Sequence, residues 1–444
     1  MVVLYLLLSI ILIILLSAKF KIHPFIVLFL VAIFYGLFAG MPLTEIVTSI
    51  NHGFGETLGK IGLIIVLGVI IGAFLENSGA AYTLAEKVLK IVGSKRVPVA
   101  MGIIGYIVSI PVFADSGFLL LSPLNKSLSK KAKISLAGSA VALGLGLTVT
   151  HTLVPPTPGP VAASGILNAD LGLVIIWGVI IAALALIPGL FFAVKYASKT
   201  YIDPDPEISD EEINERLKEA PGFLKSSLPI FIPIFLIVLK SVIISFWKNI
   251  DENIIGFISF IGEPVIALLI GTFLSFLLPK KLNLDKMLST TGWVGNSLKD
   301  AASIILITGA GGIFGKVLQN SGIADVVGQS LANVNLSIWL PFLLAAAIKT
   351  AQGSSTVALI TTASIMMPIM NTLGFVSEME KVMVVIAIGA GSAVFSHAND
   401  SFFWVVTQLS GIDVKSGYRL YSLGTFVLGT SAALFLFIFY LILV

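Results

Sequence analysis

The chain has 444 residues, of which 57% are hydrophobic and 11% are charged, whereas soluble domains carry about 25% charged residues. Apolar runs of about 20 residues recur along its whole length, which indicates a protein that crosses a membrane many times. The absence of cysteine excludes disulfides, thiolate metal sites and cysteine nucleophiles. The net charge is only +3, and no basic, aromatic-interleaved patch indicates a nucleic-acid partner.

The first apolar run is predicted to be a retained membrane span. Its basic residues, Lys19 and Lys21, follow the run instead of preceding it, and no small-residue cleavage site is present, so it differs from a signal peptide. The following segments are predicted, in order, as spans over 2–18 and 23–39, an interfacial segment over 41–57, a span over 61–75 and an amphipathic surface helix over 80–92.

The next apolar run, 97–124, is interrupted by Pro111 and by a short polar sequence, Asp115-Ser116-Gly117. Both flanks of the run are basic, and cytoplasmic loops are enriched in Lys and Arg. If both ends are cytoplasmic, the segment is a re-entrant hairpin whose tip, Asp115–Gly117, reaches the middle of the protein. A single kinked span is the alternative.

A second interruption lies in the apolar run 134–168, where Thr150 and His151 precede a stretch rich in proline and glycine that ends at Pro160. A proline removes a backbone donor and clashes with the preceding turn. Bare backbone cannot face lipid, so a broken helix at this depth must be buried in protein or line a wet cavity. A span over 171–194 is predicted to return the chain to the cytoplasm.

Residues 201–226 form a long polar segment, which we predict to be a cytoplasmic linker between a first half (1–200) and a second half (227–444). The second half repeats the pattern of the first. It is predicted to contain spans over 229–247 and 254–278, an interfacial segment over 285–298, a span over 301–318, a short amphipathic helix over 323–332, a hairpin over 338–370 that enters from outside, a broken helix over 382–408 and a last span over 421–444.

Short matches in the same order relate the two halves. Asn77-Ser78-Gly79 is echoed by Asn320-Ser321-Gly322, and His151 is echoed by His397. A Gly-x-Gly sequence and a hydroxyl residue precede each histidine: Gly144, Gly146 and Thr150 in the first half, and Gly389, Gly391 and Ser396 in the second. At nearly constant offset, these matches predict an internal duplication.

The charge distribution predicts that the two halves are inverted. If the basic loop after the first span is inside, the N-terminus is outside, the first half ends inside and the C-terminus is outside. Lys60, Lys248 and Lys381 are exceptions, because they lie near predicted outer ends. Inverted repeats with discontinuous helices are typical of secondary transporters. The expected fold is an all-α polytopic membrane protein with two inverted-topology repeats, each with a re-entrant hairpin and a discontinuous helix.

An ionisable residue at bilayer depth costs about 2.5–3.5 kcal/mol or more, so it is a functional hypothesis by default. Five residues qualify: Asp115, His151, Lys349, His397 and Asp400. The two aspartates could instead cap half-helices, and the histidines could be structural. Lys349 could be a counter-charge to an aspartate or could meet a substrate carboxylate. Asp115, His151, His397 and Asp400 are the candidates for carrying a coupling proton.

Glycine and hydroxyl residues cluster at the predicted tips and breaks. Half-helix N-termini offer free N–H groups and a partial positive charge, which suit a carboxylate, and hydroxyls can bond the OH groups of a substrate. No metal or cofactor is expected. The predicted substrate-binding residues are Asp115, Ser116, Gly117, Thr150, His151, Thr157, Gly159, Lys349, Gly353, Ser354, Ser355, Thr356, Ser396, His397, Asn399 and Asp400.

Three runs resemble the gluconate permease family of the ion transporter superfamily: FADSGFLLLSPL (113–124), THTLVPPTPGPVAA (150–163) and IGAGSAVFSHANDSFFW (388–404). The likeness extends over nearly the whole chain. It implies a homodimer in the cell membrane that imports gluconate, or a related small hydroxy or amino acid, by proton symport, with a transport half that moves as an elevator against a scaffold.

The chain departs from that family at two places. Lys349 stands where the family commonly has Arg, and Ser401-Phe402 stands where it has Pro-Gly. An Arg guanidinium can bind a carboxylate through two N–H groups at once, whereas the Lys ammonium is a single point of contact. The identity of the substrate is therefore left open. The superfamily includes sodium-coupled members, and the Ser/Thr/Asn-rich loops could coordinate Na⁺ through carbonyl and hydroxyl oxygens, so a sodium-coupled symporter for a carboxylate or a D-serine-type amino acid is the alternative.

Two other classes of function fit less well. The four histidines never form the His-Glu-x-x-His pattern of an intramembrane metalloprotease. A membrane-embedded hydrolase with Ser354 and His397 is conceivable, but no Gly-x-Ser-x-Gly sequence surrounds the serine. A channel would not need an inverted duplication. The expectation is therefore a transporter and not an enzyme.

Overall fold

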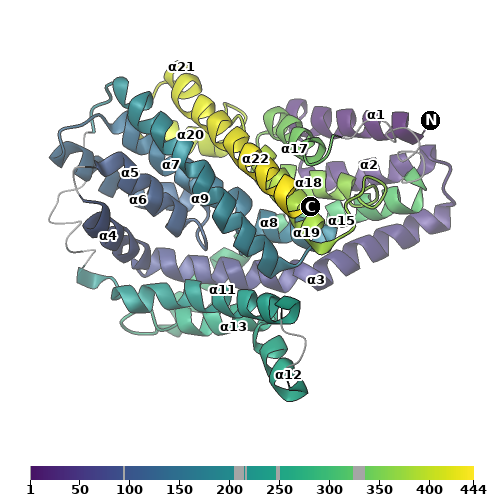
Figure 1. Cartoon of the computed structure of the whole chain (residues 1–444), viewed down its shortest axis with the longest axis horizontal. Helices are drawn as coiled ribbons and strands as arrows, with labels where there is room; N and C mark the ends of the chain where they lie inside the picture. Colours follow the sequence, from purple (N-terminus) through teal and green to yellow (C-terminus); the bar gives the residue numbers. More distant parts are fainter. Residues whose placement is uncertain (1, 94–95, 205–214, 216–217, 247–250, 324–335) are drawn as a thin grey trace.

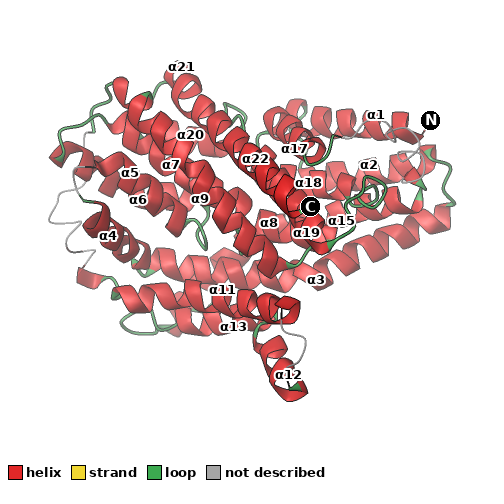
Figure 2. Ribbon diagram, in the orientation of Figure 1, coloured by secondary structure: helices red, strands yellow, loops and turns green. Residues whose placement is uncertain are grey.

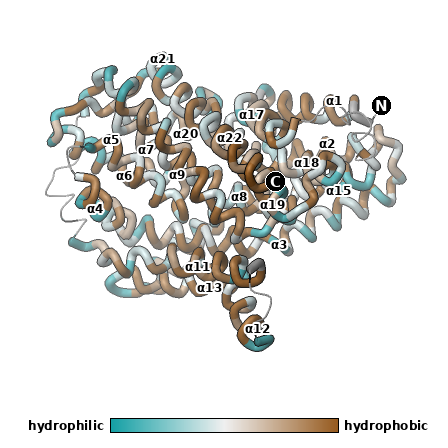
Figure 3. Tube along the Cα trace, viewed as in Figure 1, coloured by the Kyte–Doolittle hydropathy of each residue, from teal (hydrophilic) through white to brown (hydrophobic). Residues whose placement is uncertain are grey.

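The computed structural model describes residues 2–93, 96–204, 215, 218–246, 251–323 and 336–444. These residues form helices joined by turns and loops, with no strand among them (Figure 2). Hydrophobic residues dominate the helices, and hydrophilic residues gather at the loops (Figure 3). Six of the described helices are long and apolar enough to cross a membrane, or up to seven if one bent pair counts as a single span. The protein is therefore a helical, multi-pass membrane protein.

Nine α-helices lie within the described residues of the first half, in the order shown in Figure 1. They are α1 (Val2–Ile14), which continues as a π-helical turn (Leu15–Lys19), α2 (Pro24–Phe38), α3 (Leu43–Asn77), α4 (Ala80–Val92), α5 (Val97–Val108), α6 (Ala114–Lys131), α7 (Leu136–Leu153), α8 (Pro158–Leu167) and α9 (Leu171–Lys195).

The second half follows a similar order. It comprises α11 (Phe223–Phe246), α12 (Glu252–Ile261), α13 (Pro264–Ser275), α14 (Leu284–Met287), α15 (Trp293–Asn320), α17 (Trp339–Gln352), α18 (Ser355–Met366), α19 (Glu378–Ser392), α20 (Ser401–Leu409), α21 (Val414–Gly417), a π-helical turn (Tyr418–Ser422) and α22 (Leu423–Leu443). Most of the predicted amphipathic helix 323–332, the middle of the linker 201–226 and Lys248 lie outside the described residues.

The predicted interfacial segment 41–57 and the span 61–75 are not separate, because both belong to α3, a single helix of 35 residues. No proline or cap interrupts the sequence between them. The helix also has a partner along its length, since α3 packs closely on α15. A Cβ atom on Gly53 of α3 would lie 2.5 Å from the carbonyl oxygen of Gly312 on α15, so the two backbones touch at this crossing.

The predicted span 254–278 is also different in the structure. It divides into α12 and α13, which meet at an angle of 57°. Pro264 occupies the first turn of α13, where its fixed φ and missing N–H are tolerated. The α12 helix, none of whose residues is buried, projects from the body of the molecule (Figure 1).

Each half has a helical hairpin beside a broken helix. In the first half α5 and α6 form the hairpin, α7 and α8 are the two parts of the broken helix, and α5 packs on α7. In the second half α17 and α18 form the hairpin, α19 and α20 are the two parts, and α17 packs on α19.

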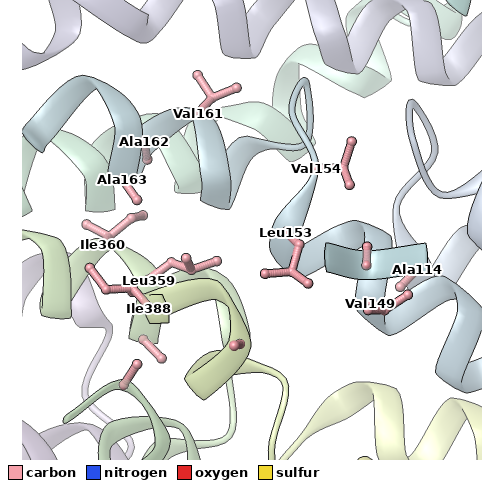
Figure 4. Close-up of a cluster of buried hydrophobic side chains, with 14 of the residues drawn as sticks. Ala114, Val149, Leu153, Val154, Val161, Ala162, Ala163, Leu359, Ile360 and Ile388 are labelled. Carbon is pink, nitrogen blue, oxygen red and sulfur yellow. The ribbon is translucent and has the colours of Figure 1, made fainter. Parts of the chain in front are cut away.

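The two halves are interlocked at their broken helices. The α8 helix packs on α18, and the α20 helix packs on α6, so each half-helix after a break contacts the hairpin of the other half. Figure 4 shows part of this core, with Val161, Ala162 and Ala163 of α8 near Leu359 and Ile360 of α18. The helices around the breaks are therefore held by contacts between the halves.

The paired Gly-x-Gly sequences have a packing role. A Cβ atom on Gly146 would clash with the carbonyl oxygen of Gly102 on α5, and one on Gly391 would clash with that of Phe342 on α17. In both halves, the second glycine therefore lets the first hairpin helix touch the backbone of the broken helix. Residues with a side chain at these positions would separate the two helices.

We predict that Gly146→Ala destabilises the protein by about 1–3 kcal/mol, the usual cost of overpacking, because backbone atoms must move to admit the methyl group. The measurement is the thermal unfolding midpoint of the purified protein in detergent. Gly59→Ala on α3 is the matched control, since its methyl group would meet no atom within 4 Å. Equal midpoints for the two variants would contradict the prediction.

Candidate functional site

The tip of the second hairpin is a glycine turn that ends one helix and begins another. Gly353 ends α17 with φ of +93°, a left-handed conformation that favours glycine. A Cβ atom at Gly353 would also clash with the carbonyl oxygen of Asn399 in the second break. Ser354 then begins α18, and its Oγ accepts a hydrogen bond from the N–H of Val357 at 3.3 Å. The tip is thus pressed against the second break.

Asp400 ends the second break and caps α20, one of the two roles that the sequence left open for it. Its Oδ1 accepts a hydrogen bond from the N–H of Phe402 at 3.0 Å. Its Oδ2 accepts one from Ser396 Oγ at 2.5 Å and one from Lys349 Nζ at 2.6 Å. Lys349 is fully buried and also donates to the carbonyl oxygen of Gly353. Lys349 is therefore the counter-charge of Asp400 and ties the tip to the break.

His397 and Asn399 complete the same junction. His397 Nε2 donates to the carbonyl oxygen of Thr350 at 2.7 Å. Asn399 Nδ2 donates to the carbonyl oxygens of Thr350 and Ala351, at 2.9 and 3.0 Å. These carbonyls belong to the last turn of α17 and have no partner within their own helix. Side chains of the second break thus provide hydrogen bonds to the last carbonyl groups of α17.

The first hairpin contributes Asp115, which lies in the first turn of α6. Phe113, and not Asp115, is the N-cap residue, and no side chain caps this helix. The Asp115 side chain is exposed and interacts with Ser401 on α20 and with the charges of Asp400 and Lys349. Among the described residues, it forms no direct ion pair with a basic side chain.

The first break contributes His151, in the last turn of α7. Its ring lies near Phe113, with 6.1 Å between the ring centroids. Its Nδ1 atom is buried and has no hydrogen-bond partner within the described part of the chain. An unpaired buried polar atom is costly, so this nitrogen is available to a ligand.

A cavity of 260 Å³ lies where these elements meet. The predicted site residues that line it are Asp115, His151, Lys349, Gly353, Ser354, Ser355, Thr356, Ser396, Asn399 and Asp400. Its wall thus comes from the first tip, the end of α7, the second tip and the second break. It is a polar chamber with two carboxylates, one ammonium and several hydroxyls.

Other predicted site residues do not line this cavity, and their polar groups form hydrogen bonds or ring contacts elsewhere. Thr150 Oγ1 donates to the carbonyl oxygen of Tyr106 at 2.9 Å. Thr157 Oγ1 donates to that of Val154 at 2.5 Å. His397 faces Thr350, as described above, and its ring stacks on Tyr418 with centroids 6.3 Å apart. These three residues therefore bind backbone carbonyls around the cavity and do not form its wall.

The remaining predicted residues are packed against apolar side chains or lie beside the wall. A Cβ atom on Gly159 would lie 2.6 Å from Leu359 Cδ1, and one on Gly117 would lie 2.9 Å from Leu147 Cδ2. Ser116 is half-buried and does not line the cavity. The start of α8 therefore faces α18, and the proline-rich break does not form a wall of the cavity.

Several residues of the cavity wall are not among those predicted from the sequence. Thr148 and Thr152 lie on the same face of α7 as His151, and Gln352 and Ser401 flank the second tip and the second break. Helical spacing could have identified Thr148, one turn before His151. Gln352 is a polar residue at the end of an apolar run, and this position could have identified it as a candidate site residue. No group of three or more His, Cys, Asp or Glu that could hold a metal occurs among the described residues.

The hydrolase alternative has no support in this geometry. Ser354 Oγ accepts the hydrogen bond that caps α18, and His397 Nε2 is bonded to a backbone carbonyl. The two side chains are therefore engaged in separate structural contacts.

Comparisons with known proteins give a consistent result. The family model described as GntP family permease matches residues 1–442. The chain is 34% identical to a gluconate permease of Pseudomonas aeruginosa, over 98% of this chain and 97% of that protein. It is 32% identical to the D-serine transporter DsdX of Escherichia coli, over 95% and 94% of the two chains.

Among solved structures, MtrF of Neisseria gonorrhoeae, described in connection with antimetabolite efflux pumps, matches with a TM-score of 0.63 and 14% identity. The match covers 89% of this chain and 84% of MtrF, and shows a shared transporter fold. The resemblance drawn from the three sequence runs is thus confirmed, and the chain is a transporter and not an enzyme. It belongs to the GntP family of permeases.

Proposed function

We propose that this permease imports gluconate, or a related small hydroxy-carboxylate, by proton symport. The observation that carries the proposal is the charge balance of the central cavity. Asp115 and Asp400 contribute two negative charges and Lys349 one positive charge, so with neutral histidine the formal sum is −1 − 1 + 1 = −1. An anion that entered alone would change the formal charge of the cavity from −1 to −2, in a site where charges are poorly screened. A cation must therefore enter with the anion, and a proton on a carboxylate meets that need.

The start of α18 is the proposed seat of the substrate carboxylate. Ser355 and Thr356 are in its first turn and line the cavity. The first N–H groups of a helix are unpaired within the helix and carry a partial positive charge, so they bind anions. Thr152 and Gln352 line the same cavity and donate hydrogen bonds to the backbone carbonyls of Thr148 and Ser354. Their side-chain oxygens can still accept hydrogen bonds from the OH groups of a hydroxy acid.

Asp115 is the best placed of the four proton-coupling candidates. Asp400 already accepts three hydrogen bonds, one of them from Lys349, and His397 is bonded to a backbone carbonyl. Asp115 is exposed to the cavity and forms no ion pair among the described residues. His151, with its unpartnered Nδ1, remains the second candidate, or a direct ligand of the substrate.

We further propose that the two halves are inverted repeats, with both termini outside, and that the permease works as a homodimer by an elevator movement. The equivalent packing of Gly146 and Gly391 supports the repeat, as does the exchange of contacts in which α8 packs on α18 and α20 on α6. The resemblance to the family of transporters supports the mechanism.

A zwitterionic substrate is the second candidate, because one relative is a D-serine transporter. The exposed carboxylate of Asp115 could pair with the ammonium of an amino acid while the carboxylate binds at α18. Such a substrate carries no net charge, so its entry would need no proton to balance the cavity. Sodium coupling, through backbone carbonyls and hydroxyls, is the third arrangement to be tested.

The first test is uptake of labelled gluconate into proteoliposomes with an imposed pH gradient, acidic on the side from which substrate enters. We expect the gradient to drive accumulation, because protonation removes the extra negative charge of the loaded cavity. Uptake that ignores the pH gradient but follows a sodium gradient would overturn the proton assignment. Competition by D-serine but by no hydroxy acid would favour the zwitterion.

The second test is Asp115→Asn, which changes the formal charge of the cavity from −1 to 0. We expect exchange of gluconate across the membrane to continue, while accumulation driven by the pH gradient is lost, because the substrate no longer needs a proton. The measurement compares counterflow with gradient-driven uptake. Asp285→Asn, at an exposed residue of α14, is the control. Retained gradient-driven accumulation in Asp115→Asn would place the proton on another residue.

The third test separates the two roles that the sequence left open for Lys349. Lys349→Met leaves Asp400 as an unpaired buried charge, and we expect a loss of about 3–5 kcal/mol of stability. Adding Asp400→Asn removes that charge and keeps a capping residue, so the double variant should recover most of the thermal midpoint and keep measurable gluconate exchange. A folded double variant without exchange would show that Lys349 binds the substrate carboxylate.

A further inference from the structure

Two of the three lysines that break the predicted charge pattern come together in the structure. Lys60 on α3 and Lys381 on α19 line one cavity, and Lys316 on α15 joins them there. The third exception, Lys248, lies outside the described residues. Basic side chains that are scattered in the sequence thus converge on one place, far from the residues that line the central cavity.

This second cavity has a volume of 320 Å³ and shares no lining residue with the central one. The two cavities lie at opposite ends of α18: Ser355 and Thr356 border the central cavity, whereas Met367 and Met370, just beyond the other end, border the second. Because α18 has 12 residues, the helix alone separates them by about 18 Å.

The lining of the second cavity carries an excess of positive charge. Among the described residues that line it, three are lysines and one is an acid, Glu56, so the formal sum is +3 − 1 = +2. Lys316 Nζ lies 3.5 Å from Glu56 Oε2, a longer distance than a good ion pair. His52 Nδ1 also approaches Glu56, at 3.7 Å. Glu56 is thus shared and cannot neutralise the lysines.

Lys60 is the least compensated of the three. Its Nζ donates to Asn168 Oδ1 at 2.6 Å, which is a neutral partner. Lys381 pairs with Glu378 at 2.6 Å, outside the lining of the cavity. If Glu378 is counted as well, the sum is +3 − 2 = +1, so the region stays positive.

The remaining polar groups of this cavity suit the same kind of ligand. Asn168, Gln319 and Asn371 line it with amide groups. Gly53 and Gly312 also line it, at the crossing where the backbones of α3 and α15 touch. Ammonium and amide donors around an open space can bind a carboxylate and its neighbouring hydroxyls.

We propose that this basic cavity is a second anion site, which binds the small carboxylate before it reaches the central cavity. The identity of this ligand as a hydroxy acid rests on the proposed function, whereas the site itself rests on the lysines. A positively charged cavity raises the local concentration of an anion and its rate of association. The basic cavity thus provides the attraction that the negatively charged central cavity lacks.

Lysine acetylation of the full chain in nanodiscs tests the proposal. The protein is treated with a limiting amount of an acetylating reagent, and the rates at Lys60 and Lys316 are measured by mass spectrometry, with Lys299 on α15 as the internal control. We expect gluconate to slow acetylation of Lys60 and Lys316 at least about 3-fold, as for any ligand present well above its Kd. Sorbitol, a neutral polyol, should have no effect, and Lys299 should not respond to either.

Two further arms decide the location and the source of the anion. The same protection should occur in Ser355→Trp, whose large side chain fills the central cavity, because the second site does not depend on the central one. It should also occur in nanodiscs of phosphatidylcholine alone. Protection that is lost in Ser355→Trp, or that is seen without gluconate only when phosphatidylglycerol is present, would overturn the proposal in favour of a conformational effect or a lipid headgroup.

A kinetic experiment gives an independent readout. We expect Lys60→Gln with Lys316→Gln to raise the KM of uptake about 3-fold or more at low ionic strength, with kcat little changed, and the difference to shrink at high salt. Lys299→Gln should behave as the unmodified protein. An unchanged KM in the double variant would contradict the proposal. If gluconate is not transported at all but still protects the lysines, the proposed function fails and the anion site stands.

Discussion

The end of α17 imposes the constraint on which the rest of the site depends. A helix that stops inside a membrane protein leaves its last carbonyls without partners, and each unsatisfied group costs several kcal/mol there. Here the carbonyls of Thr350, Ala351 and Gly353 accept hydrogen bonds from His397, Asn399 and Lys349. The hairpin tip and the second break are consequently a single hydrogen-bonded unit, and the polar residues that the sequence places there are largely occupied in holding it together.

This arrangement gives the two aspartates of the cavity different roles. Asp400 is held by Lys349, by Ser396 and by the start of α20, so it belongs to the framework. Within the described part of the chain, Asp115 has no comparable set of partners, and it is exposed to the cavity. The second half of the chain thus provides a neutralised framework, and the first half provides the carboxylate whose charge is still to be balanced.

Much of the fold could be predicted from the sequence, because proline, glycine and isolated charges in apolar runs are local signals. They locate the hairpins and the breaks, and most of the residues that line the central cavity lie within them. The continuity of α3 could not be predicted in this way, since it depends on the contact of Gly53 with Gly312 far along the chain. Nor could the choice of Asp400 over Asp115 as the partner of Lys349, which depends on side-chain distances. The unusual sequence around Thr157 and Gly159 predicts that they belong to the site, whereas Leu359 of the other half packs against Gly159.

The packing of α8 on α18 and of α20 on α6 also bears on the order in which the protein matures. The ribosome releases the first half well before α18 and α20 exist, so during that interval α6 and α8 lack the surfaces that later cover them. The first half alone has neither Lys349 nor Asp400 and encloses no complete chamber. The central cavity is therefore completed late, once the C-terminal helices are in place, and a truncated chain would present an open polar gap to the lipid or to the membrane quality-control machinery.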